Sequence, residues 1–370
     1  MTFLVNNSPL ETRYFSASLF SVRNDLWSFG NNSSGQLGTD NQTNYSSPVQ
    51  VGALSTWSSI SCGQLTTGGI INGTLWTWGN NSGGQQGLGD RTNRSSPVQV
   101  GTLSTWVQVS LGAANSLAVQ NDGTLWAWGG TFTGLNTVTR YSSPVQVGNL
   151  NTWVSVSCAD LASAGIQNDG TLWTWGYNGF GQLGNNSTST QLTPQQVGTV
   201  NIWTSVTSGS NYMLALQNNG TLWAWGGNGN GELGLNTSTF TLKTPQQVGT
   251  LSTWIQVIAG SSSVLAIQNN GTLWAWGNNS WGQLGTSNQT NYSSPVQVGR
   301  LTNWSSVEIS SINSSAIQNN GTLWTWGNNS FGQLGTGDQT NYSSPVQVGT
   351  LNNWNFVTCG NQFTVSLQQP

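Results

Sequence analysis

The sequence repeats itself about every 50 residues, and its tryptophans mark the repeat. A Leu-Trp pair recurs seven times, at Trp27, Trp76, Trp126, Trp173, Trp223, Trp274 and Trp324. A second tryptophan series with the same period falls at Trp57, Trp106, Trp153, Trp203, Trp254, Trp304 and Trp354. Prolines follow the period at Pro48, Pro97, Pro144, Pro194, Pro245, Pro295 and Pro345. A fixed period of this length predicts one array of similar units with the tryptophans in its core.

Each unit has the pattern of four short β-strands. In the sixth copy, residues 254–258 (Trp-Ile-Gln-Val-Ile) predict the first strand, and residues 264–268 predict the second. Asn269-Asn270-Gly271 predicts a hairpin turn, because Asn and Gly accept positive φ. Residues 272–277 predict the third strand. Residues 295–299 predict the fourth, whose initial proline suits an outer edge strand.

Seven such units predict an all-β, seven-bladed β-propeller with four antiparallel strands per blade. The pattern at the two ends of the chain predicts that the last blade combines strands from both ends. Residues 26–51 supply its third and fourth strands, and the C-terminal part of the chain supplies its first. Residues 18–22 and 363–367 both match the second strand, and our hypothesis is that the C-terminal candidate closes the ring. We expect a propeller over residues 18–370 and an N-terminal extension, a candidate docking segment, over residues 1–17.

The loop after the third strand carries a specific motif. Trp-Gly-x-Asn-x-x-Gly-Gln-Leu-Gly occurs at residues 175–184, 276–285 and 326–335, and after Phe29 at residues 30–38. One copy has Glu232 in place of Gln, one carries an insertion at residues 83–89, and the copy at 129–135 has lost Gln-Leu-Gly. This pattern resembles the repeats of the regulator of chromosome condensation family, and the resemblance extends over residues 18–370.

The resemblance implies a seven-bladed propeller with a binding role. It does not imply the guanine-nucleotide exchange activity of the founding member on chromatin, which in the family depends on an inserted wedge and on basic surfaces. The repeat spacing here, 47 to 51 residues, leaves no room for a wedge. Other members of the family are bacterial binding proteins or inhibitors that hold a protein partner on one face of the propeller.

Charge excludes several functions. The 370 residues include 7 Lys or Arg, 10 Asp or Glu and no His. Nucleic-acid binding needs clustered basic residues, so we predict no nucleic-acid partner. Histidine-based catalysis and histidine metal sites are impossible. No run of 18 apolar residues occurs, so we expect no membrane span. Residues 1–20 lack the basic and apolar regions of a secretory signal peptide.

The remaining reactive side chains fit structural roles. The carboxylates show no recurring pair that suggests a glycosidase, and Asp122 and Asp169 fall in predicted hairpin turns. Cys62, Cys158 and Cys359 all lie five residues after a repeat tryptophan, where other copies hold small or apolar residues. This position predicts buried packing. We therefore predict no catalytic residue, no metal site and no cofactor, and a protein that is not an enzyme.

The aromatic residues outside the core series are the candidate contacts. Phe180, Trp281 and Phe331 precede the Gly-Gln-Leu-Gly motif, and aromatic residues on the loops of a rigid scaffold can anchor a partner. A second set lies three residues before the repeat proline, at Tyr45, Tyr141, Tyr292 and Tyr342. For every one of these residues, local packing is the alternative interpretation. The candidate partner-binding set is Phe180, Trp281, Phe331, Tyr45, Tyr292 and Tyr342.

The preferred function is a non-catalytic protein-interaction or structural scaffold that presents the loops of one propeller face to a partner. A polar, uncharged composition without a secretory signal favours a phage virion protein, associated with the tail or the capsid and bound to virion structural proteins. We expect it in the virion or outside the cell, with the cytoplasm as the alternative. Two other functions stay open: a lectin-like adhesin that binds cell-surface glycans, and a secreted bacterial inhibitor or binding module.

Overall fold

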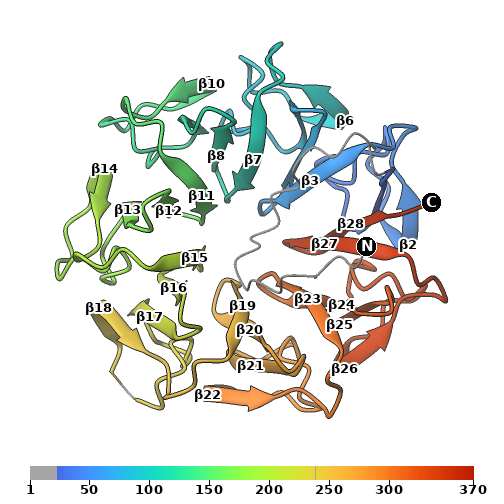
Figure 1. The fold of residues 1–370 in the computed structure, drawn as a ribbon. Helices are drawn as coiled ribbons and strands as arrows, with labels where there is room; N and C mark the ends of the chain where they lie inside the picture. The colour runs from blue at the N-terminus through green and yellow to red at the C-terminus, as the bar shows by residue number, and fades with distance from the viewer. Residues whose placement is uncertain (1–22, 238) are drawn as a thin grey trace, which may run out of the picture.

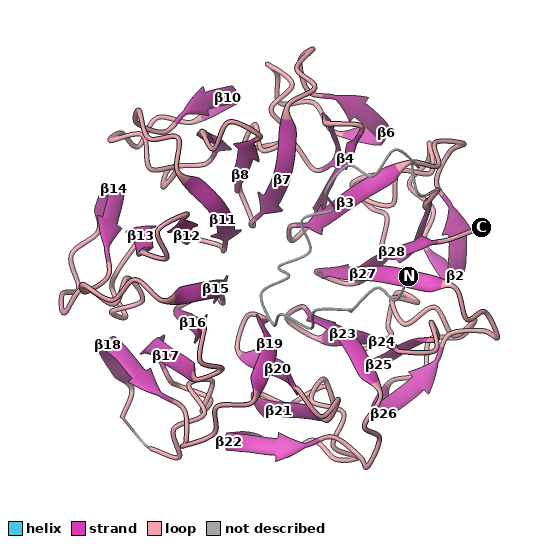
Figure 2. Cartoon of the chain, viewed as in Figure 1, coloured by secondary structure: helices cyan, strands magenta, loops and turns pink. Residues whose placement is uncertain are grey.

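The computed structural model describes residues 23–237 and 239–370, and these residues form seven four-stranded antiparallel sheets. The sheets stand as blades around a central axis (Figure 1). Strands, loops and turns make up all of this part of the chain (Figure 2), and it contains no helix that could span a membrane. The all-β, seven-bladed propeller predicted from the repeat is confirmed.

The first and second strands of each blade lie nearest the axis. In blades 1 to 7 the first strands are β3 (Trp57–Cys62), β7 (Trp106–Leu111), β11 (Trp153–Cys158), β15 (Trp203–Ser208), β19 (Trp254–Ala259), β23 (Trp304–Ile309) and β27 (Trp354–Gly360). The second strands are β4 (Thr66–Ile71), β8 (Asn115–Gln120), β12 (Ala162–Gln167), β16 (Tyr212–Gln217), β20 (Ser263–Gln268), β24 (Asn313–Gln318) and β28 (Phe363–Gln368).

The third and fourth strands follow outward. The third strands are β5 (Thr74–Gly79), β9 (Leu125–Gly129), β13 (Leu172–Gly176), β17 (Leu222–Gly227), β21 (Leu273–Gly277), β25 (Leu323–Gly327) and β1 (Asp25–Gly30). The fourth strands are β6 (Arg94–Gln99), β10 (Tyr141–Gln146), β14 (Gln191–Gln196), β18 (Thr241–Gln247), β22 (Tyr292–Gln297), β26 (Tyr342–Gln347) and β2 (Tyr45–Gln50).

The closing blade combines both ends of the described chain. Its sheet order is β2-β1-β28-β27, and Leu26 pairs with Leu367 while Gly30 pairs with Phe363. The C-terminal candidate therefore supplies the second strand, which confirms our hypothesis. The competing residues 18–22 and the predicted extension over residues 1–17 lie outside the described residues. The ring closes where β28, from the C-terminal part of the chain, pairs with β1, from the N-terminal part. Closure leaves few long free strand edges.

The predicted fourth strand was misplaced. It was expected at residues 295–299, but β22 spans Tyr292–Gln297, so Pro295 lies inside the strand. Gly277 pairs with Tyr292 and Ala275 with Val296, which places a bulge around the proline. Because β22 is an outer strand with no neighbour on one side, it can accommodate a residue without a backbone N–H.

The core lies between neighbouring blades. One cluster joins Leu214 and Leu216 of blade 4 to Trp254, Val257 and Trp276 of blade 5. Trp276 and the other second tryptophans of the Trp-x-Trp-Gly pairs are fully buried. The ring of Trp254 meets that of Trp276 edge-on at 6.2 Å. The first-strand tryptophans and the second tryptophans of the Trp-x-Trp-Gly pairs are core residues, as predicted, and they connect each blade to the preceding one. The tryptophans of the Leu-Trp pairs are only half-buried.

Strand direction gives the ring two different faces. The first strands begin on one face, which also holds the hairpin turns between second and third strands and the connectors between blades. There Trp304 N, at the start of a first strand, donates to Gly271 O in a hairpin turn of the preceding blade (3.2 Å). We call this face the turn face. On the opposite face, Asn278 N donates to Ser262 O (2.8 Å), which places the Gly-Gln-Leu-Gly loops beside the ends of the first strands. We call it the loop face.

Candidate interaction surface

Side-chain amides fold each Gly-Gln-Leu-Gly loop into a fixed shape. In blade 5, Leu284 N donates to Asn279 Oδ1 (2.9 Å), and Trp281 N donates to Gln283 Oε1 (2.9 Å). Both amide side chains are fully buried. The Asn and Gln side chains of the motif therefore accept hydrogen bonds from backbone N–H groups inside the loop, in place of backbone carbonyls. This role explains why both residues recur in the repeat.

The same loops are fixed to the next blade. The carbonyl of Gln283 accepts hydrogen bonds from Trp326 Nε1 (2.8 Å) and Ser314 Oγ (2.6 Å) in blade 6. Blades 3 and 4 share an equivalent bond from Trp225 Nε1 to the carbonyl of Gln182 (2.8 Å). The loop face is thus a set of loops held by the buried core of the neighbouring blade.

The copy that lost Gln-Leu-Gly lacks this connection. Its loop in blade 2 faces Trp175, whose buried Nε1 has no hydrogen-bond partner among the described residues. Gly134 of that loop still packs against the Trp175 ring, because a Cβ there would lie 3.0 Å from Nε1. The junction between blades 2 and 3 therefore keeps the packing of a motif glycine against the indole ring but lacks the hydrogen bond from the indole Nε1 to a loop carbonyl.

The loop aromatics occupy different blades of the loop face. Phe180 and Trp281 are 41% and 44% exposed, whereas Phe331 is half-buried. They belong to blades 3, 5 and 6 and are spread around the ring instead of forming one site. The Phe180 ring contacts Tyr177 edge-on at 6.4 Å.

The tyrosine set lies at the loop-face ends of the outer strands. Tyr45, Tyr292 and Tyr342 are half-buried, as is Tyr141. Asn41 Nδ2 donates to the Tyr45 hydroxyl (3.1 Å), and Asn288 Nδ2 to that of Tyr292 (3.0 Å). The Tyr342 hydroxyl donates to Asp338 Oδ2 (3.1 Å). The hydroxyls of Tyr45, Tyr292 and Tyr342 are therefore each held by a residue of the preceding loop.

Sequence reasoning missed exposed apolar residues on this face. Phe240, in the loop before β18, is 74% exposed, and Leu161, at the β11–β12 turn, is 42% exposed. Phe240 O accepts Asn228 N (2.8 Å), and Phe180 packs beside the neighbouring Gly227. Leu161 O accepts Tyr177 N (2.9 Å). We call Leu161, Tyr177, Phe180 and Phe240 the blade 3–4 patch. The only signal in the sequence is that Phe240 interrupts a polar loop.

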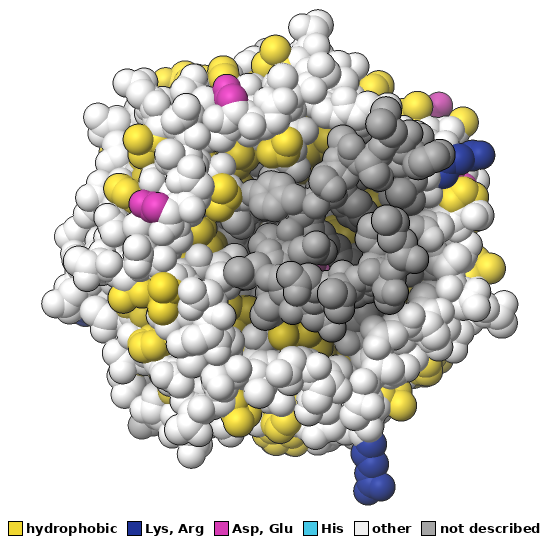
Figure 3. Space-filling model, viewed as in Figure 1, with side chains coloured by type: hydrophobic (Ala, Val, Ile, Leu, Met, Phe, Trp, Pro, Cys, Tyr) yellow, Lys and Arg dark blue, Asp and Glu magenta, His cyan; other side chains and the backbone are white. Residues whose placement is uncertain are grey.

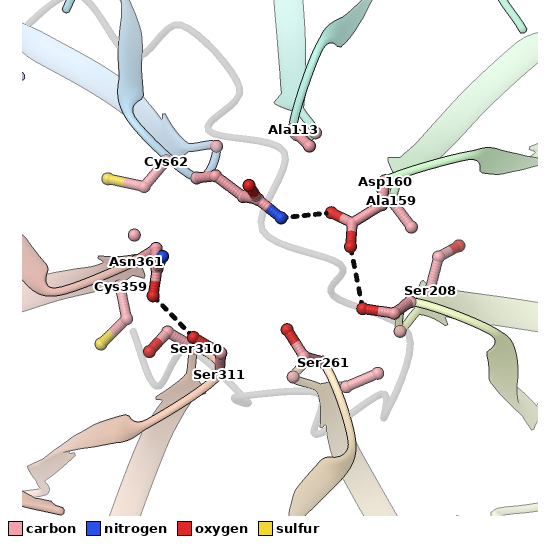
Figure 4. A pocket seen from close by; sticks show the side chains of 18 of the residues that line it. Cys62, Ala113, Ala159, Asp160, Ser208, Ser261, Ser310, Ser311, Cys359 and Asn361 are labelled. Atoms are coloured by element: carbon pink, nitrogen blue, oxygen red, sulfur yellow. Dashed lines mark hydrogen bonds between the residues drawn. The ribbon is translucent and has the colours of Figure 1, made fainter. Parts of the chain in front are cut away.

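The centre of the loop face is a shallow polar cavity of about 260 Å³. Seven three-residue segments, each five to seven residues after a first-strand tryptophan, surround it (Figure 4). Figure 4 views this face from the side opposite to Figure 1, since the blades run clockwise in one and anticlockwise in the other. The middle residue of each segment must be small. A Cβ at Gly112 would lie 2.1 Å from the carbonyl oxygen of Ala159 in the next blade.

Asp160 is the one carboxylate among the described residues that line this cavity, and both of its oxygens accept hydrogen bonds. Gln64 Nε2 donates to Oδ1 (3.1 Å) and Ser210 Oγ to Oδ2 (2.9 Å). Ser311 Oγ donates to Asn361 Oδ1 (2.7 Å) across another junction. Residues from blades 1, 3 and 4 thus meet at one polar rim.

The cysteines lie beside this rim as packing residues. Cys158 and Cys359 are buried, as predicted, and Cys62 is half-buried. Burial raises the pKa of the Cys158 and Cys359 thiols to about 12, so both stay protonated at neutral pH. Among the described residues, no group of three or more Cys, Asp or Glu is arranged to hold a metal ion.

Comparisons with known proteins agree with the geometry. The family model described as the RCC1-like domain matches residues 130–369, and that of the Regulator of chromosome condensation (RCC1) repeat matches residues 23–69 and 72–119. The chain belongs to the RCC1-like family. No curated protein shows significant sequence similarity to it.

Three solved structures share the fold. Yeast RCC1 (Prp20) bound to Kap60 is 20% identical with a TM-score of 0.86, over 94% of this chain and 90% of that one. Prp20p from Saccharomyces cerevisiae, described with its binding properties to Gsp1p and histones, is 19% identical with a TM-score of 0.85, over 94% and 91%. Human WBSCR16 is 21% identical with a TM-score of 0.83, over 94% and 99%.

Proposed function

We propose that this RCC1-like protein is a non-catalytic interaction scaffold whose loop face binds a protein partner. The blade 3–4 patch carries the proposal. Phe240 and Phe180 are large, exposed and apolar, and they border the same segment around Gly227 and Asn228. Exposed aromatic side chains on neighbouring loops of a rigid scaffold are candidate anchors for a protein partner, because aromatic residues supply much of the affinity in protein-binding sites.

The chemistry around the patch favours an uncharged contact. Asp160, next to Leu161, is already bound by Gln64 and Ser210. Lys243 lies against Gly181, behind Phe180. Because so few charges are present, we expect an affinity that depends mainly on apolar burial and changes little with salt. The solved relatives bind proteins according to their descriptions, which supports a protein partner here.

Affinity capture with matched variants tests the proposal. The variant Phe180→Ala/Phe240→Ala removes the two phenylalanines of the patch, and Leu301→Ala removes an exposed apolar side chain on the turn face as control. Quantitative mass spectrometry should show a protein retained by the unchanged chain and by the control but lost with the double variant. Calorimetry with that purified partner should then show the affinity reduced at least about tenfold. Loss with Leu301→Ala alone would place the binding face on the other side.

We further propose that the partner is a structural protein of a virion, in a phage tail or associated with the capsid, and that the protein acts in the virion or outside the cell. The support is compositional: 17 charged residues in 370 and loops rich in Asn, Ser and Thr. Proteomics of purified particles tests the assignment, and absence of the chain from them would reject it. Retention on a glycan array without any captured protein would favour the lectin alternative.

A further inference from the structure

The central cavity of the loop face is lined by polar side chains that come from different blades. The third residues of its seven segments are Gln64, Ala113, Asp160, Ser210, Ser261, Ser311 and Asn361, and only the alanine is apolar. The middle residues of the segments are Gly, Ala or Ser, so none of them fills the space with a large side chain. Figure 4 shows Asp160 and Ser261 directed toward the opening. The cavity of about 260 Å³ is therefore a preformed place for a polar group.

Asp160 gives this cavity a negative charge that no neighbour compensates. No Lys or Arg occurs among the described residues that line the cavity, and Asp160 forms no ion pair within residues 23–237 and 239–370. Its partners, Gln64 and Ser210, are neutral. A carboxylate has about four acceptor positions, so these two bonds leave room for further donors. A charge in a concave site also raises the local concentration of opposite charges.

The hydrogen bond from Gln64 to Asp160 is open to water. Gln64 is exposed and belongs to blade 1, so it reaches past blade 2, where Ala113 has only a methyl group. Asp160 itself is half-buried, and its bond from Ser210 is partly buried. Because water can replace an exposed donor, a stronger donor can displace Gln64 at little cost. The Oδ1 side of Asp160 is therefore the accessible side of the carboxylate.

We propose that this cavity binds the guanidinium group of an arginine that the protein partner inserts from the loop face, with Asp160 as its counter-charge. The inference rests on the proposed function and names the chemistry of the group that the partner presents. A guanidinium is planar and has five N–H donors, so it can bond a carboxylate through two of them and hydroxyl oxygens through others. Ser261 and Ser311 supply such hydroxyls in the lining. Charge-assisted pairs of this kind are stronger than the neutral bond from Gln64.

The cavity adjoins the blade 3–4 patch, because Asp160 and Leu161 are consecutive in the turn between β11 and β12. One partner can therefore cover the patch with apolar groups and place one arginine in the cavity. The patch remains an uncharged contact, and a single ion pair at the rim adds only a weak dependence of affinity on salt.

An NMR titration of the full chain with a small ligand tests the cavity without the partner. The ligand is N-acetyl-arginine N-methylamide, and its matched control is the citrulline analogue, which has the same shape but an uncharged ureido group. With isotope-labelled alanine methyl groups, the arginine compound should shift the Ala113 signal in a saturable manner. The signal of Ala316, which is fully buried in β24, should stay unchanged. The citrulline compound should shift neither signal.

Two matched variants each remove one negative charge. Asp160→Asn should raise the dissociation constant of the arginine compound at least about tenfold, because the counter-charge is lost. Asn361 holds the equivalent place in blade 7, so the ring accommodates asparagine there. Asp169→Asn lies in a hairpin turn of the turn face, where Figure 3 shows few charged side chains, and should leave the constant unchanged. Asn270 already fills the equivalent turn position in blade 5.

Three results would overturn the proposal: no shift of Ala113, an equal shift with the citrulline compound, or unchanged binding to Asp160→Asn. Tighter binding of N-acetyl-lysine N-methylamide would reject arginine in favour of an ammonium group. A captured partner lost with Phe180→Ala/Phe240→Ala but held equally by Asp160→Asn would leave the proposed function intact and reject the arginine contact. Binding of the arginine compound with no captured protein would support the cavity site and reject the proposed function.

Discussion

At the scale of single residues, the junctions between blades depend on one repeated polar contact inside an apolar core. Trp225 Nε1 donates to the Gln182 carbonyl, whereas the equivalent Nε1 of Trp175 has no partner among the described residues. Both indoles are fully buried. Trp175 and Trp225 therefore differ in the hydrogen bond of their indole Nε1 and not in burial. Comparing substitutions at the two positions measures the contribution of that hydrogen bond to stability.

We predict that Trp225→Phe destabilises the protein more than Trp175→Phe, by about 1–2 kcal/mol in free energy of unfolding. Both changes remove the same atoms, but only the first leaves a buried carbonyl without its indole donor. Urea unfolding followed by circular dichroism measures the difference. Equal losses would show that the bond contributes nothing beyond packing.

A second residue-scale contact joins the first strands. Ser61 Oγ accepts Leu111 N (3.0 Å), and Thr207 Oγ1 accepts Ala259 N (3.0 Å), each from the next blade. In blade 6 the equivalent position, four residues after the tryptophan, holds Glu308. Burial raises the pKa of its carboxyl group to about 8, and the thiols of Cys62 and Cys359 are its titratable neighbours.

We predict that Glu308 makes stability fall as pH rises from about 4.5 to about 8. In this range the unfolded chain releases the proton while the folded chain retains it, so ionisation favours unfolding; above pH 8 the contribution is constant. Glu308→Thr, which restores the hydroxyl, should remove this fall. Urea unfolding at pH 5, 7 and 9 measures it. The same pH slope in both proteins would contradict the role of Glu308.

At the scale of elements, the hairpin turns show how far local sequence goes. Asn269-Asn270-Gly271 forms the predicted turn, but only Gly271 has positive φ (75°), so the turn is longer than a two-residue hairpin. Blade 1 has one residue fewer, and there both Asn72 and Gly73 have positive φ. Asp122 accepts Thr124 N (2.9 Å) just as Asn270 accepts Thr272 N (3.1 Å). Asp122 is therefore a turn residue, as the sequence predicted.

We predict that Gly271→Ala costs more stability than Gly299→Ala. Both glycines have positive φ, which costs an alanine about 1 kcal/mol. At Gly271 the new Cβ would also lie 2.2 Å from Thr302 O, whereas nothing lies within 4 Å at Gly299. Thermal unfolding of the two variants provides the comparison. A larger loss at Gly299 would contradict this account of the turn.

Strand boundaries were less predictable than strand number. Pro295 was assigned to the start of a strand because proline cannot donate a backbone hydrogen bond, yet it lies within β22. The edge position and the bulge opposite Ala275 and Gly277 permit this, and both are properties of the sheet as a whole. A local pattern cannot reveal which side of a strand lacks a neighbour.

At the scale of the whole molecule, the repeat predicted the ring, but the proposed binding surface depends on contacts between blades. Gln64 and Asp160 are 96 residues apart and meet only because the ring closes. Phe240 lies in a single loop that breaks the repeat, so periodicity gave no reason to select it. The repeat therefore predicts the scaffold well and the proposed site poorly, because the residues of that site are exceptions to the repeat.

The central claim is that the loop face over blades 3 and 4 holds the partner while the turn face does not. Hydrogen exchange with and without the captured partner tests it most directly, since binding slows exchange in covered segments. We predict slower exchange in residues 159–162, 177–183 and 228–237, and no change in the hairpin turn at 269–271. Slower exchange confined to the hairpin turns and connectors would contradict the claim.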